Sequence, residues 1–98
     1  MTRATLLRYT KRTYRDGAVA EVKIWGVPSS VSGSRHRFKY SLFYGRGGDR
    51  LVGYDNERGK GDHRHYGDTE EAYSFTSLRR LLADYRADVG RLRRGKKL

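Results

Sequence analysis

The last quarter of the chain carries a single stripe of apolar residues at helical spacing, and the need to bury this stripe constrains the fold more than any other feature. The stripe lies within residues 77–93 and consists of Leu78, Leu81, Leu82, Tyr85, Val89 and Leu92. Intervals of three and four residues predict an amphipathic helix, with Thr76 or Ser77 as its N-cap. A helix with one apolar face must pack on another element, which the rest of the chain has to supply.

The residues before the helix alternate between apolar and polar with the period of two that is typical of β-strands. Strands are predicted over 4–14, 18–27, 36–44, 50–56 and 63–66, with a hairpin turn at Asp16-Gly17. The loop 29–34 is flexible enough to act as a flap over a substrate. The expected fold is therefore α+β. An antiparallel meander of four to five strands (about 4–66) carries one C-terminal amphipathic helix (about 77–93) on one face. A basic tail (94–98) completes a single domain over 1–98.

The charge balance of the chain indicates a polyanionic partner. The 98 residues include 22 Lys or Arg and 11 Asp or Glu, which gives a net charge of +11. Nucleic acid is the first candidate partner, because phosphate neutralisation supplies affinity that is independent of sequence; an anionic membrane or an acidic protein is less favoured. The length excludes a two-domain enzyme. The lack of cysteine excludes disulfides, and no apolar run is typical of a membrane span or signal peptide. A cytoplasmic protein is expected.

The segment 53–66 concentrates the residues that could carry chemistry. His63 and His65 are two positions apart, so on a strand they share a face with Cα atoms ~6.6 Å apart. Two imidazoles near neutrality suit metal-free RNA cleavage, in which one takes the proton of the 2′-hydroxyl and the other protonates the leaving 5′-oxygen. Lys60 and Arg58, in the adjacent loop, could stabilise the scissile phosphate. Asp55 could orient an imidazole.

The same segment also allows a metal-dependent alternative. In that case Asp55, Glu57, His63 and His65 would hold a divalent ion. A nucleotide-binding P-loop is excluded, because the Gly-rich loop lacks the Gly-x-x-x-x-Gly-Lys-Ser/Thr spacing. Further nucleic-acid contacts are expected from basic side chains and one aromatic ring. These residues are Arg58, Arg64, Lys39, Tyr54, Arg93 and Arg94.

The chain resembles the TumE-like family of type II toxin–antitoxin systems. The resemblance is carried by Glu21-Val22-Lys23-Ile24-Trp25, by Lys39-Tyr40 and above all by the string from Tyr54 to His65, which reads Tyr-Asp-Asn-Glu-Arg-Gly-Lys-Gly-Asp-His-Arg-His. It runs from about residue 18 through the helix and is weakest over the first fifteen residues. The resemblance implies a cytoplasmic prokaryotic toxin that is neutralised by a cognate antitoxin with a DNA-binding helix-turn-helix.

Three functions remain in competition at this point. The first is a metal-independent ribonuclease toxin without cofactors, in which His63 and His65 act as acid and base, Lys60 and Arg58 hold the phosphate and Asp55 orients a ring. The second is the metal-dependent nuclease. The third is a non-catalytic protein that binds nucleic acid or ribosomes through its Arg and Lys surface. The ribonuclease hypothesis requires the two imidazoles to stand side by side within reach of a substrate.

Overall fold

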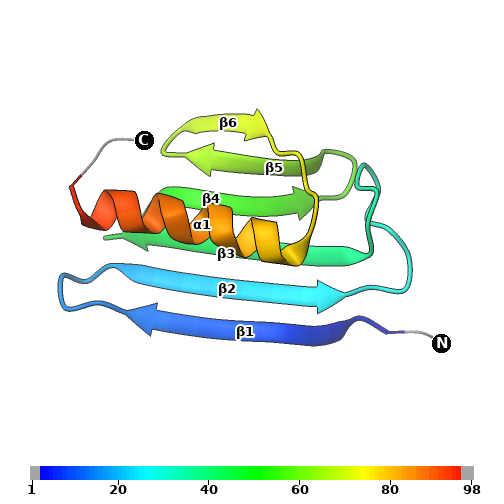
Figure 1. The fold of residues 1–98 in the computed structure, drawn as a ribbon, viewed down its shortest axis with the longest axis horizontal. Helices are drawn as coiled ribbons and strands as arrows, with labels where there is room; N and C mark the ends of the chain where they lie inside the picture. Colours follow the sequence, from blue (N-terminus) through cyan, green and yellow to red (C-terminus); the bar gives the residue numbers. More distant parts are fainter. Residues whose placement is uncertain (1–2, 96–98) are drawn as a thin grey trace.

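The fold is a six-stranded antiparallel sheet with one helix across it (Figure 1). The computed structural model describes residues 3–95. The strands are β1 (Thr5–Thr13), β2 (Val19–Gly26), β3 (Phe38–Arg46), β4 (Asp49–Glu57), β5 (Gly61–Tyr66) and β6 (Thr69–Ala72), and the helix is α1 (Leu78–Arg93). Strand order follows the sequence from β1 to β6. This arrangement confirms the α+β meander with a C-terminal helix and adds β6, a short strand that was not predicted. Residues 96–98 of the predicted basic tail lie outside the described part of the chain.

The helix packs with its apolar stripe against one face of the sheet, as its spacing predicts. Ser77 is the N-cap, and its hydroxyl accepts a hydrogen bond from the backbone N–H of Arg80 at 3.1 Å. The buried helix residues include Leu81, Tyr85 and Val89. They pack against apolar strand residues that alternate as the sequence predicts, such as Ile24 and Leu42. The core therefore lies between α1 and the middle strands. Within residues 3–95, no helix has the length and apolar character needed to cross a membrane.

Tyrosines supply much of this core, and each buried hydroxyl has a polar partner. The buried tyrosines are Tyr40, Tyr44, Tyr54, Tyr73 and Tyr85. Their partners are Asp62, Arg93, Asp88, Asp84 and the carbonyl of Phe43, respectively. A buried phenol contributes apolar area only while its hydroxyl stays hydrogen-bonded. Burial raises the pKa of the Tyr54 phenol, and its hydrogen bond to Asp88 raises that pKa further.

A β-bulge changes which residues of β4 share a face. Tyr44 pairs with Val52, but the next residue, Gly45, pairs with Arg50, so Leu51 is the extra residue of the bulge. Val52 and Tyr54 are buried under the helix. Past the bulge, Arg50 therefore lies on the opposite face, together with Gly53 and Asp55.

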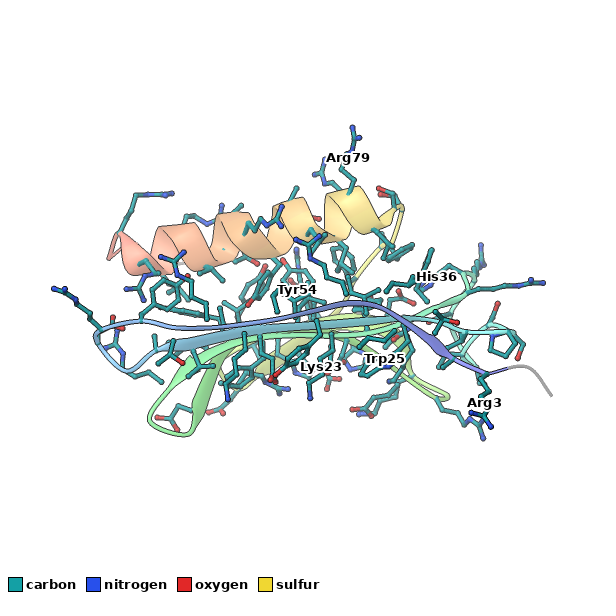
Figure 2. All side chains as sticks on the ribbon, turned by 90° about the horizontal axis from the view of Figure 1, so that it is seen from below. Arg3, Lys23, Trp25, His36, Tyr54 and Arg79 are labelled. Carbon is teal, nitrogen blue, oxygen red and sulfur yellow. The ribbon has the colours of Figure 1, made fainter. Side chains whose placement is uncertain are left out.

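The face of the sheet opposite the helix carries mainly polar and charged side chains. Figure 2 shows Lys23 and Trp25 on this side and Tyr54 on the helix side. We call this surface the open face, because among residues 3–95 no helix lies on it.

The loop between β2 and β3 is fastened to the β4–β5 hairpin. Asp62 accepts hydrogen bonds from the hydroxyl of Ser34 at 2.5 Å and from Nε2 of His36 at 2.6 Å. The backbone N–H of Gly59 donates to the carbonyl of Ser32 at 2.7 Å. Gly33 and Gly61 approach so closely that a Cβ on Gly33 would lie 2.6 Å from the backbone nitrogen of Gly61. These contacts hold the loop in place, although its sequence predicts a flexible flap.

Candidate active site

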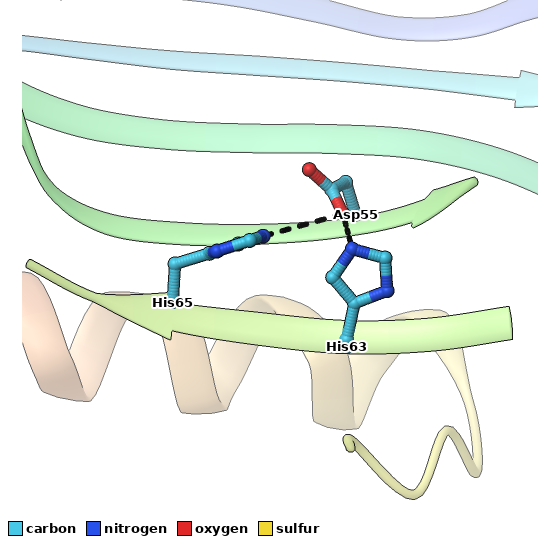
Figure 3. A group of neighbouring side chains, drawn as sticks. All are labelled: Asp55, His63 and His65. Carbon is cyan, nitrogen blue, oxygen red and sulfur yellow. Dashed lines mark ion pairs between the residues drawn. The ribbon is translucent and has the colours of Figure 1, made fainter. Parts of the chain in front are cut away.

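Two adjacent strands bring Asp55, His63 and His65 together on the open face. Asp55 pairs directly with His63 across β4 and β5, and His65 follows two residues later on the same face. Figure 3 shows both imidazoles turned toward the Asp55 carboxylate. Nε2 of His63 lies 2.7 Å from Oδ1 of Asp55, and Nε2 of His65 lies 3.7 Å from the same oxygen. The ring centroids are 5.1 Å apart, so the two imidazoles are neighbours on this face.

The cluster is less exposed than the sequence analysis required. Only 5% of the His63 side chain and 11% of the His65 side chain are exposed, against 20% for Asp55. Its cover is polar and forms no part of the hydrophobic core. Glu70 of β6 lies over His63, with Oε1 3.2 Å from Nε2, and Lys60 lies 3.8 Å from the same Glu70 oxygen. Both covering side chains are well exposed, and an exposed ion pair of this kind is worth only ~0–1 kcal/mol. A shallow hollow beside them is lined by Lys60, His63 and Glu70.

In each histidine, the hydrogen bond at Nδ1 determines which ring nitrogen carries the proton of the neutral form, and the two histidines differ in this respect. Nδ1 of His63 lies 3.1 Å from the carbonyl of Gly61, so this nitrogen carries a proton and donates it. Nε2 of His63 faces two carboxylates, and a second proton there would bond to either. Arg50, which has no acceptor, donates to Nδ1 of His65 at 2.9 Å. The proton of a neutral His65 must therefore sit on Nε2, toward Asp55.

Three polar atoms of this cluster are buried without a hydrogen bond of acceptable geometry. They are Oδ1 of Asp55, Nε2 of His63 and Nε2 of His65. The same three residues each offer one ligand atom within 4.8 Å of the other two, an arrangement that could also hold a metal ion. Buried polar atoms are rarely left unpaired, because the loss of hydration costs ~1–3 kcal/mol each. Convergence of three such atoms makes this cluster the candidate active site of the described residues.

The other candidate site residues are dispersed. Lys60 stands at the edge of the cluster, whereas Arg58 lies at the β4–β5 turn beside a different hollow, shared with Lys39 and Pro28. Lys39 donates to the carbonyl of Asn56. Glu57 is exposed at the end of β4 and is not among the three converging residues.

Several predicted nucleic-acid contacts lie on the helix side of the sheet. Tyr54 is fully buried there, so a base could not reach its ring. Arg64 bonds to Glu71 at 2.6 Å and lies over the ring of Tyr66. Arg93 donates to the hydroxyl of Tyr44 at 2.9 Å. Arg94 is exposed at the end of α1. These four residues do not border the histidine cluster.

The sequence analysis missed two residues that contact the cluster, Arg50 and Glu70. Arg50 reaches it only because of the bulge at Leu51, and Glu70 reaches it from the unpredicted strand β6. Asp62 and His36 form a separate pair on the other side of β5. There the ring of His36 stacks on Phe75 with centroids 3.8 Å apart.

Comparison with known proteins gave a match to one family. The family model described as Toxin TumE matches residues 3–93. Neither the curated proteins nor the solved structures gave a match.

Proposed function

This chain belongs to the TumE toxin family, and on that premise we propose that it arrests growth by cleaving RNA without a metal, with His63 and His65 as the acid–base pair. The observation that carries the proposal is the position of Asp55. One carboxylate oxygen lies within 2.7 Å and 3.7 Å of the two imidazoles on the open face. A toxin of this kind has an antitoxin partner, which we propose carries a helix-turn-helix, and RNA as its target places its action in the cytoplasm.

His63 is suited to be the general acid. Its Nδ1 proton is held by the carbonyl of Gly61, and its Nε2 faces two carboxylates, Asp55 and Glu70, which would pair with a proton carried on that nitrogen. This proton would pass to the 5′-oxygen as the P–O bond to that oxygen breaks.

His65 is suited to be the general base once Arg50 engages a phosphate. In the free protein Arg50 occupies the lone pair of Nδ1. When the guanidinium turns to the scissile phosphate, Nδ1 becomes free to take the proton of the 2′-hydroxyl. The resulting alkoxide attacks the adjacent phosphorus and leaves a 2′,3′-cyclic phosphate and a free 5′-hydroxyl. Substrate would enter by displacing Glu70 and Lys60, after which Lys60 is available to a phosphate oxygen.

The test combines cleavage of RNA in excess chelator with growth arrest in cells. General acid–base groups contribute roughly 10²–10⁴-fold to a rate, so His63→Ala and His65→Ala should each lower cleavage at least ~100-fold and abolish growth arrest. His36→Asn is the matched control, because it removes an imidazole that lies on the other side of the sheet. Melting temperatures of all three variants would confirm that they fold. Growth arrest that survives both active-site substitutions would instead favour non-catalytic binding of nucleic acid or ribosomes.

A metal-dependent nuclease is the second candidate, and the three converging unpaired atoms favour it. Asp55, His63 and His65 would be the ligands, and Glu70 lies close enough to join them. Glu57 would not take part. The ion would activate a water molecule for attack on phosphorus. His65 could bind an ion through Nε2 only with its proton on Nδ1, so Arg50 would have to turn away from the ring. RNA that survives in chelator and is cleaved after addition of Mn²⁺ or Zn²⁺ would establish this candidate in place of the first.

A further inference from the structure

One helix is too narrow to cover six strands, and β1, at one edge of the sheet, remains uncovered on the helix side. Adjacent strands are ~4.8 Å apart, whereas a helix with its side chains is ~10 Å wide. The helix lies over the middle strands, and β1 remains exposed along its whole length (Figure 1). A groove therefore runs between β1 and α1 on the helix side of the sheet.

The groove has an apolar floor and two rows of arginines as walls. Its floor is formed by Ala20, Val22, Tyr85 and Val89. Arg8 and Arg12 lie four residues apart on β1, or about 13 Å along the strand. Arg86 and Arg93 lie seven residues apart on α1, or about 10 Å along the helix. The two rows therefore run side by side over a similar length.

Most of this positive charge has no ion-pair partner among residues 3–95. In the part of the chain that the structure describes, no ion pair involves Arg8, Arg12 or Arg86, whereas Arg93 lies 3.4 Å from Asp16. Unneutralised cations beside an apolar floor are complementary to a ligand with acidic flanks and an apolar ridge.

We propose that this groove is the docking site for an acidic amphipathic helix of the antitoxin, an inference that rests on the toxin–antitoxin pairing proposed above. The helix would lie beside α1 and complete a two-helix layer over the sheet. Its apolar ridge would cover Ala20, the half-buried residue of the floor, and acidic residues on its two flanks would meet Arg12 and Arg86.

The groove is poorly suited to RNA. Single-stranded RNA binds through aromatic faces on which bases stack. The aromatic ring at the edge of the groove, Tyr14, is already covered by guanidinium groups. Arg93 lies 3.6 Å and Arg12 lies 4.5 Å from its ring centroid. Tyr85 is almost completely buried, so neither ring offers a free face.

The test is the affinity of purified charge-reversal variants for the cognate antitoxin, measured by calorimetry. Arg86→Glu and Arg12→Glu should each raise the Kd at least ~10-fold. Each has a matched control with the same charge change on the same element. Arg79→Glu lies on the outer side of α1 (Figure 2), and Lys11→Glu lies on β1 but points to the open face, so both should change the Kd less than ~3-fold.

Equal effects in the groove variants and their controls would overturn the proposed groove, as would weaker binding of a short single-stranded RNA with unchanged antitoxin binding. Failure of the wild-type protein to bind the antitoxin at all would refute the pairing itself and the groove with it. A change in unfolding temperature of the variants would show whether a lost affinity arises from misfolding, and hydrogen exchange of the wild-type complex supplies an independent measurement. The proposal requires protection of β1 and α1 in the complex.

Discussion

The buried carboxylate of Asp88 allows a quantitative test of how the tyrosine-rich core is held together. Asp88 is 2% exposed and lies in the helix face that packs on the sheet. One of its oxygens, Oδ2, accepts hydrogen bonds from the hydroxyls of Tyr54 and Tyr66, the latter at 2.9 Å. The other oxygen accepts from Arg91. We expect Asp88→Asn to destabilise the fold, because the amide keeps the shape of the side chain but loses its charge.

The expected loss in the free energy of unfolding follows from the number of hydrogen bonds whose acceptor changes from a charged carboxylate to a neutral amide. A hydrogen bond to a charged group contributes ~1.5–3 kcal/mol and one between neutral groups ~0.5–1.5 kcal/mol, so two tyrosine hydrogen bonds lose about 2 kcal/mol. If the amide oxygen faces the tyrosines, the amide nitrogen faces Arg91 and a further hydrogen bond is lost. The total is about 2–3 kcal/mol. For a domain of this length, 1 kcal/mol corresponds to roughly 4–8 °C in Tm, so we expect Tm to fall by at least ~8 °C.

Asp84 supplies a matched control one turn earlier in α1. It also bonds to a tyrosine and an arginine, with Tyr73 at 2.6 Å and Arg80 at 3.0 Å. Its side chain is 24% exposed, against 2% for Asp88, so water can replace what the amide loses. Urea unfolding should give a loss below ~1 kcal/mol for Asp84→Asn. Equal losses in the two variants, or a larger loss at Asp84, would refute the reasoning that burial makes the carboxylate of Asp88 important.

Two further predictions concern the core and the loop that crosses the hairpin. Burial raises the pKa of the phenols of Tyr40, Tyr54, Tyr73 and Tyr85 above the ordinary value of 10. Their contribution to stability is therefore complete below pH ~10 and is lost as the pH rises above this value, by about 1.4 kcal/mol per pH unit for each tyrosine. Urea unfolding at several alkaline pH values measures this slope. A free energy of unfolding that does not change with pH in this range would contradict the prediction. Gly33→Ala should destabilise the fold by at least ~1 kcal/mol more than Gly47→Ala, because both glycines have positive φ but only Gly33 would place its Cβ against backbone. Equal losses in urea unfolding would show that the loop moves aside freely.

Most of the fold could be predicted from periodicity, because the core depends on one face of each element. The family match over residues 3–93 likewise confirms the resemblance seen in the string from Tyr54 to His65. The strand β6 was missed because its four residues, Thr69 to Ala72, are all exposed and two are acidic, so no apolar alternation marks them. Asp88 falls among the apolar positions of α1, but nothing in its neighbours along the chain reveals that two tyrosines from the sheet reach it.

The candidate site could be predicted only where it depends on one strand. The spacing of His63 and His65 fixes their common face, whatever the partner strands do. Arg50 could not be placed in the same way. Plain alternation puts residues 50 and 55 on opposite faces, and only the extra residue at Leu51 reverses this. Contacts between side chains of neighbouring strands depend on the register of the strands, which a single sequence does not specify.

Consecutive side chains of β5 point to opposite faces of the sheet and therefore make different contacts. Asp62 points to the helix side and holds the β2–β3 loop through Ser34 and His36, while the next residue, His63, points to the open face and meets Asp55. The anchor of the loop and the imidazole are therefore separated by a single peptide unit. The backbone at this position is therefore fixed from both surfaces of the sheet, by the loop on one side and by the neighbouring carboxylate on the other.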